Sequence, residues 1–340
     1  MPSTAPNVAI VGATGAVGLE LLDVLAQRRF PVGKLRLLAS GRSAGRTLEF
    51  DGRSCKVEQL NEKCFDRIDL ALFSAGGEIS RKFGPIAADA GCTVVDNSSA
   101  FRMTDGIPLV VPEVNPQAID GLGLGGGQII ANPNCSTIIM LVPVTPLHRA
   151  ARARRIVIST YQAASGAGAA AMAELKQQTR EVLDDLPPTC NVFEQQYAFN
   201  LFSHNSPVGP DGYNTEETKM VCETHKIWED ETPAITATCV RVPVLRAHAE
   251  SINVQFEQPL DEDEARRLLA EAPGVRLLDD REGNRFPTPL DATQRDEILV
   301  GRIRRDRSRP EGDSLDLFVC GDQLRKGAAL NAVQIAELLL

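Results

Sequence analysis

The sequence has few histidines, no closely spaced cysteine pair and no long apolar segment. Its four histidines form no cluster at metal-ligand spacing, and its eight cysteines include no C-x-x-C motif. We therefore expect neither a structural metal site nor a disulfide framework in this chain of 340 residues. No apolar run approaches the roughly 18 residues that a membrane-spanning helix needs.

Basic residues are outnumbered, since 36 Lys and Arg face 45 Asp and Glu and give a net charge of −9. A chain of this charge has no global field that attracts nucleic acid or an anionic membrane, so any phosphate must bind in a local basic pocket. Residues Met1–Val8 lack the basic and apolar segments of a signal peptide. We expect a cytoplasmic protein with neither nucleic acid nor membrane as a partner.

The composition is that of a globular protein, because 43% of the residues are hydrophobic and 24% are charged. Its length suggests two domains. In the first third, short apolar runs alternate with amphipathic stretches. Strands are expected at Asn7–Val11, Lys34–Ala39, Leu70–Ser74, Thr93–Asp96 and Gln128–Ala131, and helices at Leu19–Arg28 and Ile79–Ala90. This order predicts an α/β fold with a doubly wound parallel sheet.

Beyond Asn134 the pattern changes to longer strands of a second sheet, which we expect to be mixed or antiparallel. The expected strands are Ile156–Tyr161, Ala234–Val242 and Ser251–Phe256, and the expected helices are Ala170–Leu183 and Asp261–Glu271, with a charged turn at Arg302–Asp313. The last segment, Gly327–Leu340, has the pattern of an amphipathic helix that packs back on the first domain.

A glycine-rich turn, Gly12-x-x-Gly15-x-x-Gly18, links the first strand to the first helix. Glycines let the backbone approach a pyrophosphate, and the helix N-terminus offers unpaired N–H groups. A tight turn with no ligand is the alternative interpretation. The position of the motif directly after the first strand favours a dinucleotide site.

The end of the second strand reads Ser40-Gly41-Arg42-Ser43, where an NAD-binding site usually has a carboxylate for the ribose. A guanidinium and two hydroxyls suit a 2′-phosphate instead. NADP is therefore the predicted cofactor, although Arg42 could also be a solvated loop charge.

Cys135 differs from the other cysteines, because Asn132-Pro133-Asn134 precedes it and an apolar helical run follows it. At a helix N-terminus the thiol pKa falls, and the thiolate is a nucleophile toward a carbonyl. Asn134 and the free N–H groups could hold the resulting oxyanion. The other thiols are expected to be small buried side chains.

His248 is the candidate base, since it comes just after a strand in a segment that also contains Arg241 and Arg246. Neighbouring cations would keep it neutral near pH 7. His148, His204 and His225 have no such companions, and a surface position at a strand end is the alternative for His248.

Taken together, the chain resembles the aspartate-β-semialdehyde dehydrogenase family over essentially its full length. The matching segments are VGATGAVG, ASGRSAG, SAGG, DNSSAFR, VVPEVNP, NPNCST, YQAASGAG, YNTEETKM, RVPVLRAH and GDQLRKGAALNAVQIAE. Ten motifs in one order make the resemblance highly specific.

The resemblance implies a role for each matching residue. Cys135 would be the acyl-thioester nucleophile, His248 the acid/base, and Gln162 and Asn134 further catalytic residues. Arg241 and Glu216 would bind the substrate's carboxylate and amino group, and Arg102 and Lys219 its phosphate. NADP would contact Gly12, Thr14, Gly15, Ala16, Val17, Ser40, Arg42, Ser43, Ser74, Ser165, Gly166, Gln323 and Asn331, and no metal is implied.

The resemblance also implies a Rossmann-type NADP domain at 1–132, with 321–340 packing back on it, and a mixed-sheet α+β catalytic and dimerisation domain at 133–320. The implied assembly is a homodimer or a tetramer. The implied reaction is reversible reduction of L-4-aspartyl phosphate by NADPH to aspartate 4-semialdehyde and phosphate, in lysine, methionine, threonine and diaminopimelate biosynthesis.

Two alternatives remain at this point. N-acetyl-γ-glutamyl-phosphate reductase shares the chemistry but has a cysteine motif like N-P-G-C-Y, and a non-catalytic NADP-binding paralogue would be expected to lose Cys135 or His248. Two departures from a simple pattern also remain. Pro143 and Pro146 should kink the helix after Cys135, and the loosely patterned segment Leu183–Gly212 receives no role.

Overall fold

The structure is a computed structural model that describes residues 5–309 and 311–340, and these fall into two compact units. The first unit runs up to Asn134 and includes Ala328–Leu340, whereas the second is Cys135–Gly327. The chain therefore passes between units just before Cys135 and just after Gly327, a few residues later than the boundaries we expected at 132 and 320.

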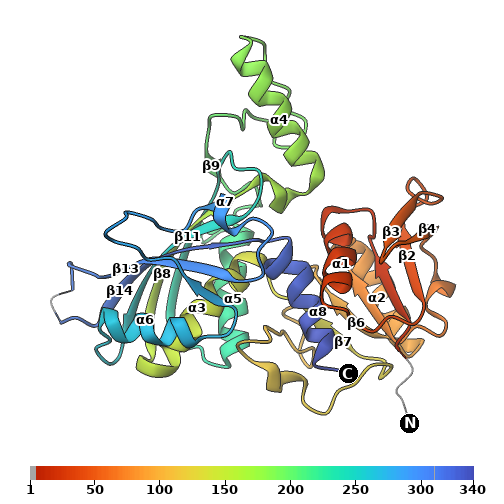
Figure 1. Ribbon diagram of the computed structural model, residues 1–340, viewed down its shortest axis with the longest axis horizontal. Coiled ribbons are helices and arrows are strands. Elements are labelled where there is room, and N and C mark those ends of the chain that lie inside the picture. The colour runs from red at the N-terminus through yellow and green to blue at the C-terminus, as the bar shows by residue number, and fades with distance from the viewer. Residues whose placement is uncertain (1–4, 310) are drawn as a thin grey trace. The chain divides into compact units, whose positions relative to one another are not determined.

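The first unit contains the doubly wound sheet, with strand order β3-β4-β2-β1-β5-β6-β7 (Figure 1). Its elements are β1 (Val8–Val11), α1 (Ala16–Gln27), β2 (Leu35–Ala39), β3 (Thr47–Phe50), β4 (Arg53–Gln59), η1 (Glu62–Phe65), β5 (Leu70–Phe73), α2 (Gly77–Asp89), β6 (Thr93–Asp96), η2 (Pro116–Ile119), β7 (Ile129–Ala131) and α8 (Leu330–Glu337). All neighbours pair in parallel except β3 with β4. The predicted Rossmann-type fold is thus confirmed. The β3–β4 hairpin was not predicted, because its strands are polar and largely exposed.

Both faces of this sheet are covered, as the continuous apolar strands predicted. On one face, Ile10 of β1 belongs to a core with Leu21 of α1 and Val333 of α8. On the other face, Val11 packs in a core with Phe83 of α2. The predicted final helix packs back on this unit, where α8 contacts β6 and α1. It is shorter than the expected Gly327–Leu340, because a π-helical turn (η4, Arg325–Ala329) precedes it, and it is buried almost all round where an amphipathic pattern was expected.

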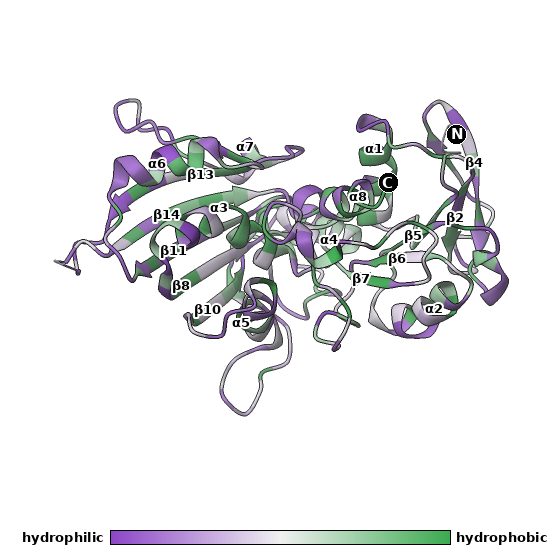
Figure 2. Cartoon of the chain, turned by 90° about the horizontal axis from the view of Figure 1, so that it is seen from below, coloured by the Kyte–Doolittle hydropathy of each residue, from purple (hydrophilic) through white to green (hydrophobic). Residues whose placement is uncertain are grey.

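The second unit is built on a mixed sheet of order β12-β13-β14-β11-β8-β10-β9, as expected, and Figure 2 shows β14, β11, β8 and β10 side by side. Its elements are α3 (Cys135–Ala151), β8 (Ala153–Gln162), η3 (Ala164–Ala167), α4 (Ala169–Leu183), β9 (Phe202–Ser203), α5 (Thr215–Trp228), β10 (Ala234–Arg241), β11 (His248–Phe256), α6 (Glu262–Glu271), β12 (Val275–Leu277), α7 (Pro289–Ala292), β13 (Ile298–Arg305) and β14 (Ser314–Gly321). Only the β8–β10 and β12–β13 pairs are parallel.

Helix α3 packs on β8, β11, β13 and β14, and its residues from Ser136 to Thr145 are all buried. It continues as one helix through Pro143 and Pro146, so the prolines do not shorten it. The expected turn at Arg302–Asp313 begins later than predicted, since β13 extends to Arg305; residue 310 of that turn lies outside the described residues.

Helix α4 stands away from the sheet of its own unit (Figure 1). It has a small core in which Leu175 packs with Phe193 and Tyr197 of the following segment. Over residues 5–309 and 311–340, we find no helix with both the length and the apolar character needed to cross a membrane.

Candidate active site

Cys135 is the first residue of α3, so the predicted position at a helix N-terminus is confirmed. The thiol-bearing carbon packs closely against the chain that returns at the end of the second unit. A Cβ atom added to Gly327 would lie 2.9 Å from Cβ of Cys135 and 3.2 Å from Cβ of Gln323. The absence of a side chain at Gly327 therefore leaves space for the side chain of Cys135.

Gln162 is the last residue of β8 and is fully buried beside the start of α3. Its Nε2 atom donates to Oγ of Ser136 at 3.0 Å, and it also lies 3.4 Å from Oγ1 of Thr160 and from Oε1 of Glu216. These contacts fix the amide next to Cys135 and join it to a carboxylate from another element.

That carboxylate belongs to α5, which begins with a capping box between Asn214 and Glu217. Glu216, in the first turn, is buried, and Lys219 lies one turn further on. Their side chains share one helix face as predicted, with Nζ of Lys219 2.9 Å from Oε2 of Glu216. An acidic and a basic group thus lie together within reach of Gln162.

Arg241 ends β10 and is 5% exposed, so its charge is held in the interior. Its Nε donates to Oδ1 of Asn205 at 3.3 Å, and its Nη1 donates to the carbonyl of Ala163 at 3.4 Å. Burial lowers the pKa of Arg241, and the negative charges of Glu216 and Cys135 are among the groups that oppose this change. The guanidinium is therefore close to both the carboxylate and the thiol.

His248 opens β11 and is fully buried, which excludes the surface position considered for it. The backbone N–H of Ala163 donates to its Nδ1 at 3.0 Å, so the proton of the neutral ring is on Nε2. Nε2 has no hydrogen-bond partner among the described residues.

The ring is held neutral as predicted, but mainly for a different reason. Burial, and after it the charge of Arg241, lowers the pKa of His248 to about 3. Arg246, the second cation we expected to act on it, instead forms an ion pair with Asp322 at 2.7 Å.

The turn between β8 and α4 packs against Arg241 and His248. A Cβ atom at Gly166 would lie 3.0 Å from Nη1 of Arg241 and 3.0 Å from Cε1 of His248. Ser165 accepts a hydrogen bond from Nε2 of Gln323, and Oε1 of Gln323 accepts one from the N–H of Ala247, next to His248. The structure therefore gathers these predicted residues around Arg241 and His248.

The other predicted cofactor residues belong to the first unit, where a cleft of about 410 Å³ lies at the carboxyl ends of β1, β2 and β5. Gly12, Thr14, Gly15, Ser40 and Ser74 line it. This is where the strand order reverses, the usual ligand position in a doubly wound sheet. Ala16 and Val17 begin α1, and Arg42 and Ser43 belong to the turn after β2; these four do not line the cleft.

The residues of this cleft fit a dinucleotide. A Cβ atom at Gly12 would lie 2.4 Å from the carbonyl oxygen of Ser74, and one at Gly18 would lie 2.2 Å from that of Gly12. Only glycine allows this tight turn, which also has a positive φ at Gly12. No side chain caps the N-terminus of α1, so its first N–H groups can meet a phosphate.

Two predicted residues of the first unit have internal hydrogen bonds. The Nδ2 atom of Asn331 donates to the carbonyl of Val110 and to Oδ1 of Asn132, at 2.9 and 2.7 Å. Both hydrogen atoms of this amide are therefore used inside the first unit. Arg102 is buried and donates to the backbone carbonyls of Asn132 and Asn97, both at 2.9 Å. Asn134, also buried, directly precedes Cys135.

Sequence reasoning missed the contribution of Leu183–Gly212. The hydroxyl of Tyr197 donates to the carbonyl of Val242 at 2.5 Å, and Asn205 contacts Arg241. His204 was expected to have no companions, but it bonds Ser206, and burial and Arg241 lower its pKa to about 4. No sequence motif identifies this segment, because the side chains that make these contacts lie on irregular backbone.

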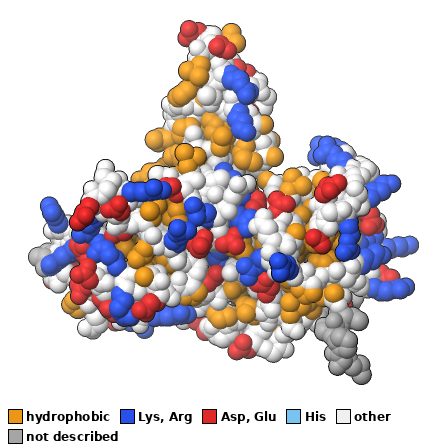
Figure 3. All heavy atoms as spheres, viewed as in Figure 1, with side chains coloured by type: hydrophobic (Ala, Val, Ile, Leu, Met, Phe, Trp, Pro, Cys, Tyr) orange, Lys and Arg blue, Asp and Glu red, His pale blue; other side chains and the backbone are white. Residues whose placement is uncertain are grey.

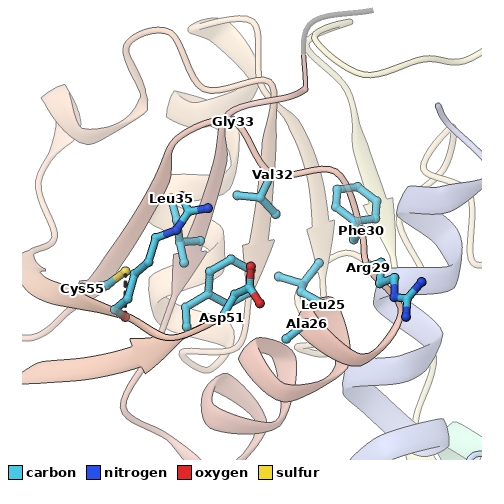
Figure 4. A pocket seen from close by; sticks show the side chains of 11 residues that line it. Leu25, Ala26, Arg29, Phe30, Val32, Gly33, Leu35, Asp51 and Cys55 are labelled. Atoms are coloured by element: carbon cyan, nitrogen blue, oxygen red, sulfur yellow. Dashed lines mark hydrogen bonds between the residues drawn. The ribbon is translucent and has the colours of Figure 1, made fainter.

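Another pocket, of about 310 Å³, lies between α1 and the β3–β4 hairpin and contains none of the predicted site residues (Figure 4). Figure 4 shows Leu25, Phe30 and Leu35 around it with Arg29 and Asp51. In the described part of the chain, no three His, Cys, Asp or Glu side chains are placed to share a metal ion.

A doubly wound dinucleotide unit and a second unit that contains Cys135 at a helix N-terminus with buried His248 and Arg241 together have the architecture of a nicotinamide-dependent dehydrogenase that works through a cysteine. Family models agree. Residues 7–122 match the NAD binding domain of semialdehyde dehydrogenase, and residues 144–326 match its dimerisation domain. The chain belongs to the semialdehyde dehydrogenase family.

Relatives within the family are similar over their full length. The aspartate-semialdehyde dehydrogenase of Synechocystis sp. is 54% identical, over 100% of this chain and 98% of its own. That of Aquifex aeolicus is 50% identical, over 98% of each chain. Among solved structures, aspartate semialdehyde dehydrogenase II of Vibrio cholerae, complexed with ASA, has a TM-score of 0.94 at 47% identity and covers 99% of this chain and 98% of its own.

Proposed function

We propose that this protein has aspartate-semialdehyde dehydrogenase activity, the reversible NADPH-dependent reduction of L-4-aspartyl phosphate to aspartate 4-semialdehyde and phosphate. The relatives' shared activity supports the reaction class. The observation that carries the proposal is the site in which Cys135 at a helix N-terminus lies with the buried side chains of Gln162, Glu216, Arg241 and His248.

In the reducing direction, the Cys135 thiolate attacks the acyl carbon of the substrate, and phosphate leaves to give a thioester on Cys135. NADPH, when bound, supplies the hydride that reduces this thioester. Breaking the carbon–sulfur bond then releases the aldehyde and regenerates the thiolate. The N-terminus of α3 favours the thiolate at both ends of the cycle.

In this proposal, His248 acts on the oxygen of the reacting carbonyl. Because Ala163 occupies Nδ1, the atom that carries the ring proton is Nε2. A neutral imidazole can donate this proton in a hydrogen bond to the oxyanion of each tetrahedral intermediate. The donor half of the acid/base role is therefore the half that this geometry supports.

The charged residues recognise the substrate in this proposal. The fixed guanidinium of Arg241 would hold its carboxylate with paired N–H donors, and Glu216 would hold its ammonium group. Lys219 and Arg102 would bind the phosphate, and Gln162 would orient the acyl group beside Cys135.

NADP is the cofactor, and the residues around Gly12, Ser40 and Ser74 would hold it. The missing carboxylate at the end of β2 supports NADP over NAD. We also predict cofactor contacts from four residues of other segments, which are Ser165, Gly166, Gln323 and Asn331.

The assay follows NADPH formation from NADP with aspartate semialdehyde or N-acetylglutamate semialdehyde, each with and without phosphate. We expect a signal only with aspartate semialdehyde and phosphate together. Activity with the acetylated substrate alone would instead support the alternative reductase, and activity with neither would support a non-catalytic paralogue.

A homodimer through the second unit is also part of the proposal, since residues 144–326 match a dimerisation domain. Figure 3 shows apolar side chains gathered on and below α4. The exposed large apolar residues of this unit include Leu183, Leu186, Phe199, Leu201 and Val208. Light scattering should give twice the mass of 36.7 kDa. A mass four times that of the chain would instead support a tetramer.

We place the protein in the cytoplasm. All eight cysteines are free, including Cys55 and Cys190 at partly exposed positions, which suits a reducing compartment. Fractionation of the source cells with an antibody to the chain tests this location.

A further inference from the structure

Glu250 is a buried acid that the proposed mechanism does not use. Its exposed fraction is 0%, and neither carboxyl oxygen has a hydrogen-bond partner among the described residues. Burial raises the pKa of Glu250 well above the ordinary value for a glutamic acid, so the neutral form is favoured. An unsatisfied carboxyl group in a core destabilises the fold, and an apolar residue would destabilise it less. Its presence at this position therefore calls for a compensating function.

The strand pairing places Glu250 directly behind the site. It follows His248 by two residues on β11, so both side chains are on the same face of the sheet. In the antiparallel pairing with β8 it lies opposite Thr160, and Gln162 is two residues further on that strand. The face that presents Gln162 and His248 to the substrate thus continues inward to Glu250.

Ser136 connects Glu250 to the reacting groups. It is fully buried and directly follows Cys135 in α3, which packs on β8 and β11. Its Oγ accepts from Nε2 of Gln162 at 3.0 Å. Nε2 of Gln162 is also 3.4 Å from Oγ1 of Thr160, the residue opposite Glu250, so Ser136 and Glu250 lie over neighbouring positions of the same sheet face. The Ser136 hydroxyl also opposes the rise in the pKa of Glu250.

The other titratable groups around Glu250 belong to neighbouring strands and to the site. Burial raises the pKa of Cys239 on β10 and of Cys320 on β14, and the charge of Glu250 adds to both effects. The ionised form of Glu250 is therefore opposed by burial, and the Ser136 hydroxyl is the polar group that acts on it.

We propose that Glu250 is a positioning residue for the reaction: from its place behind Ser136, it orients the Ser136 hydroxyl and, through it, the Gln162 amide beside Cys135. This role rests on the proposed function. It predicts that Glu250 affects the chemical step and leaves cofactor binding unchanged, because Glu250 touches neither substrate nor cofactor.

The test compares Glu250→Met with Glu250→Gln, two unbranched side chains of similar size that differ in their ability to form hydrogen bonds. We expect E250M to lower kcat by about tenfold to a hundredfold, the range for small misplacements of reacting groups, with the KM for NADP unchanged. E250Q should recover most of this loss. Ile252→Ala, on the same strand face but deeper, is the control that lowers the melting temperature without lowering kcat in folded enzyme.

A double-mutant cycle with Ser136→Ala tests the route of the effect. If Glu250 acts through Ser136, S136A/E250M should be no slower than S136A. An E250M enzyme with the kcat of the parent would overturn the proposal, as would independent, multiplying losses from the two substitutions or a folded E250Q enzyme as slow as E250M. Failure of the proposed function appears differently, since the parent itself would then form no NADPH from aspartate semialdehyde and phosphate.

Discussion

The backbone N–H of Ala163 donates a hydrogen bond to Nδ1 of His248 at 3.0 Å. This bond connects the end of β8 to the start of β11. A Cβ atom at Gly166 would lie 3.1 Å from Nε2 of His248 and 3.0 Å from Nη1 of Arg241, so both groups border Gly166. The ring can turn neither toward a different partner nor away from the site without losing that bond. The position of the His248 ring is therefore determined by backbone at the ends of two strands.

Gly166→Ala tests how closely this arrangement is packed. The added methyl group would lie 3.0 Å from Nη1 of Arg241 and from Cε1 of His248, so one of the two must move by a few tenths of an ångström. We expect kcat/KM for aspartate semialdehyde to fall by about tenfold to a hundredfold. Gly123→Ala, where no atom lies within 4 Å of the added group, is the control. Equal kcat/KM in both variants would contradict the close contact.

Most residues of this site could be predicted from the sequence because they lie at the ends of helices and strands. Cys135 begins a helix, Gln162 and Arg241 end parallel strands, and Glu216 lies in a capped first turn. Positions of this kind can be recognised from local pattern and motif. The doubly wound sheet was predictable for the same reason, from apolar runs such as Val8–Val11.

The missed features depend on contacts between distant residues. Neither His204 nor Asn205 has a local pattern, yet the fold brings both to Arg241. The neutrality of His248 was predicted from neighbouring arginines, whereas burial is the largest cause of its lowered pKa. Burial of one ring depends on how α3, β8 and β11 pack, which residue spacing does not specify.

Cys135→Ala should abolish NADPH formation while NADP still binds, because cofactor and nucleophile use different residues. Iodoacetamide should label Cys135 first and substrate should protect it. The structure leaves fewer thiols that could react with iodoacetamide before Cys135, because burial raises the pKa of Cys92 to about 12 and Cys64 is also buried. Mass spectrometry of the labelled peptides measures the order, and Cys55→Ser is the control with normal activity. Simultaneous labelling of Cys135 and Cys55 would argue against an activated thiolate.

Lys219→Ala and Arg102→Ala should each raise the KM for phosphate far more than that for the aldehyde. A hydrogen bond to a charged group contributes about 1.5–3 kcal/mol, which corresponds to roughly 10–150-fold. R102A should also lower the melting temperature, because its guanidinium donates to the carbonyls of Asn97 and Asn132, whereas K219A removes a partly exposed side chain. Steady-state kinetics with varied phosphate decides, and an unchanged KM for phosphate in both variants removes these residues from that role.

His204 should make the folded protein less stable in acid. The folded-state pKa of His204, about 4, lies below the roughly 6.5 of a free histidine, so between these values the unfolded chain binds the extra proton. The contribution is complete above pH 6.5 and is lost as the pH falls toward 4. His204→Gln should reduce the slope of unfolding free energy against pH by up to about 1.4 kcal/mol per unit in this window. Urea unfolding at several pH values measures it, and identical slopes in parent and variant would exclude this origin.

The last prediction concerns the choice between NADP and NAD. Arg42 is exposed in the turn directly after β2, two residues beyond Ser40, which lines the cofactor cleft. A 2′-phosphate bound there would meet its paired N–H donors, whereas NAD has no group for them. Arg42→Ala should lower kcat/KM for NADP by about 10–150-fold on the scale of about 1.5–3 kcal/mol for a charged hydrogen bond. The low end is expected, because salt and water screen an exposed pair. Use of NAD by the same variant should hardly change, so the ratio of kcat/KM for the two cofactors is the measurement. Arg46→Ala, a few residues along the same loop, is the control. A similar loss with both cofactors would mean that Arg42 supports the conformation of the loop and does not recognise the phosphate.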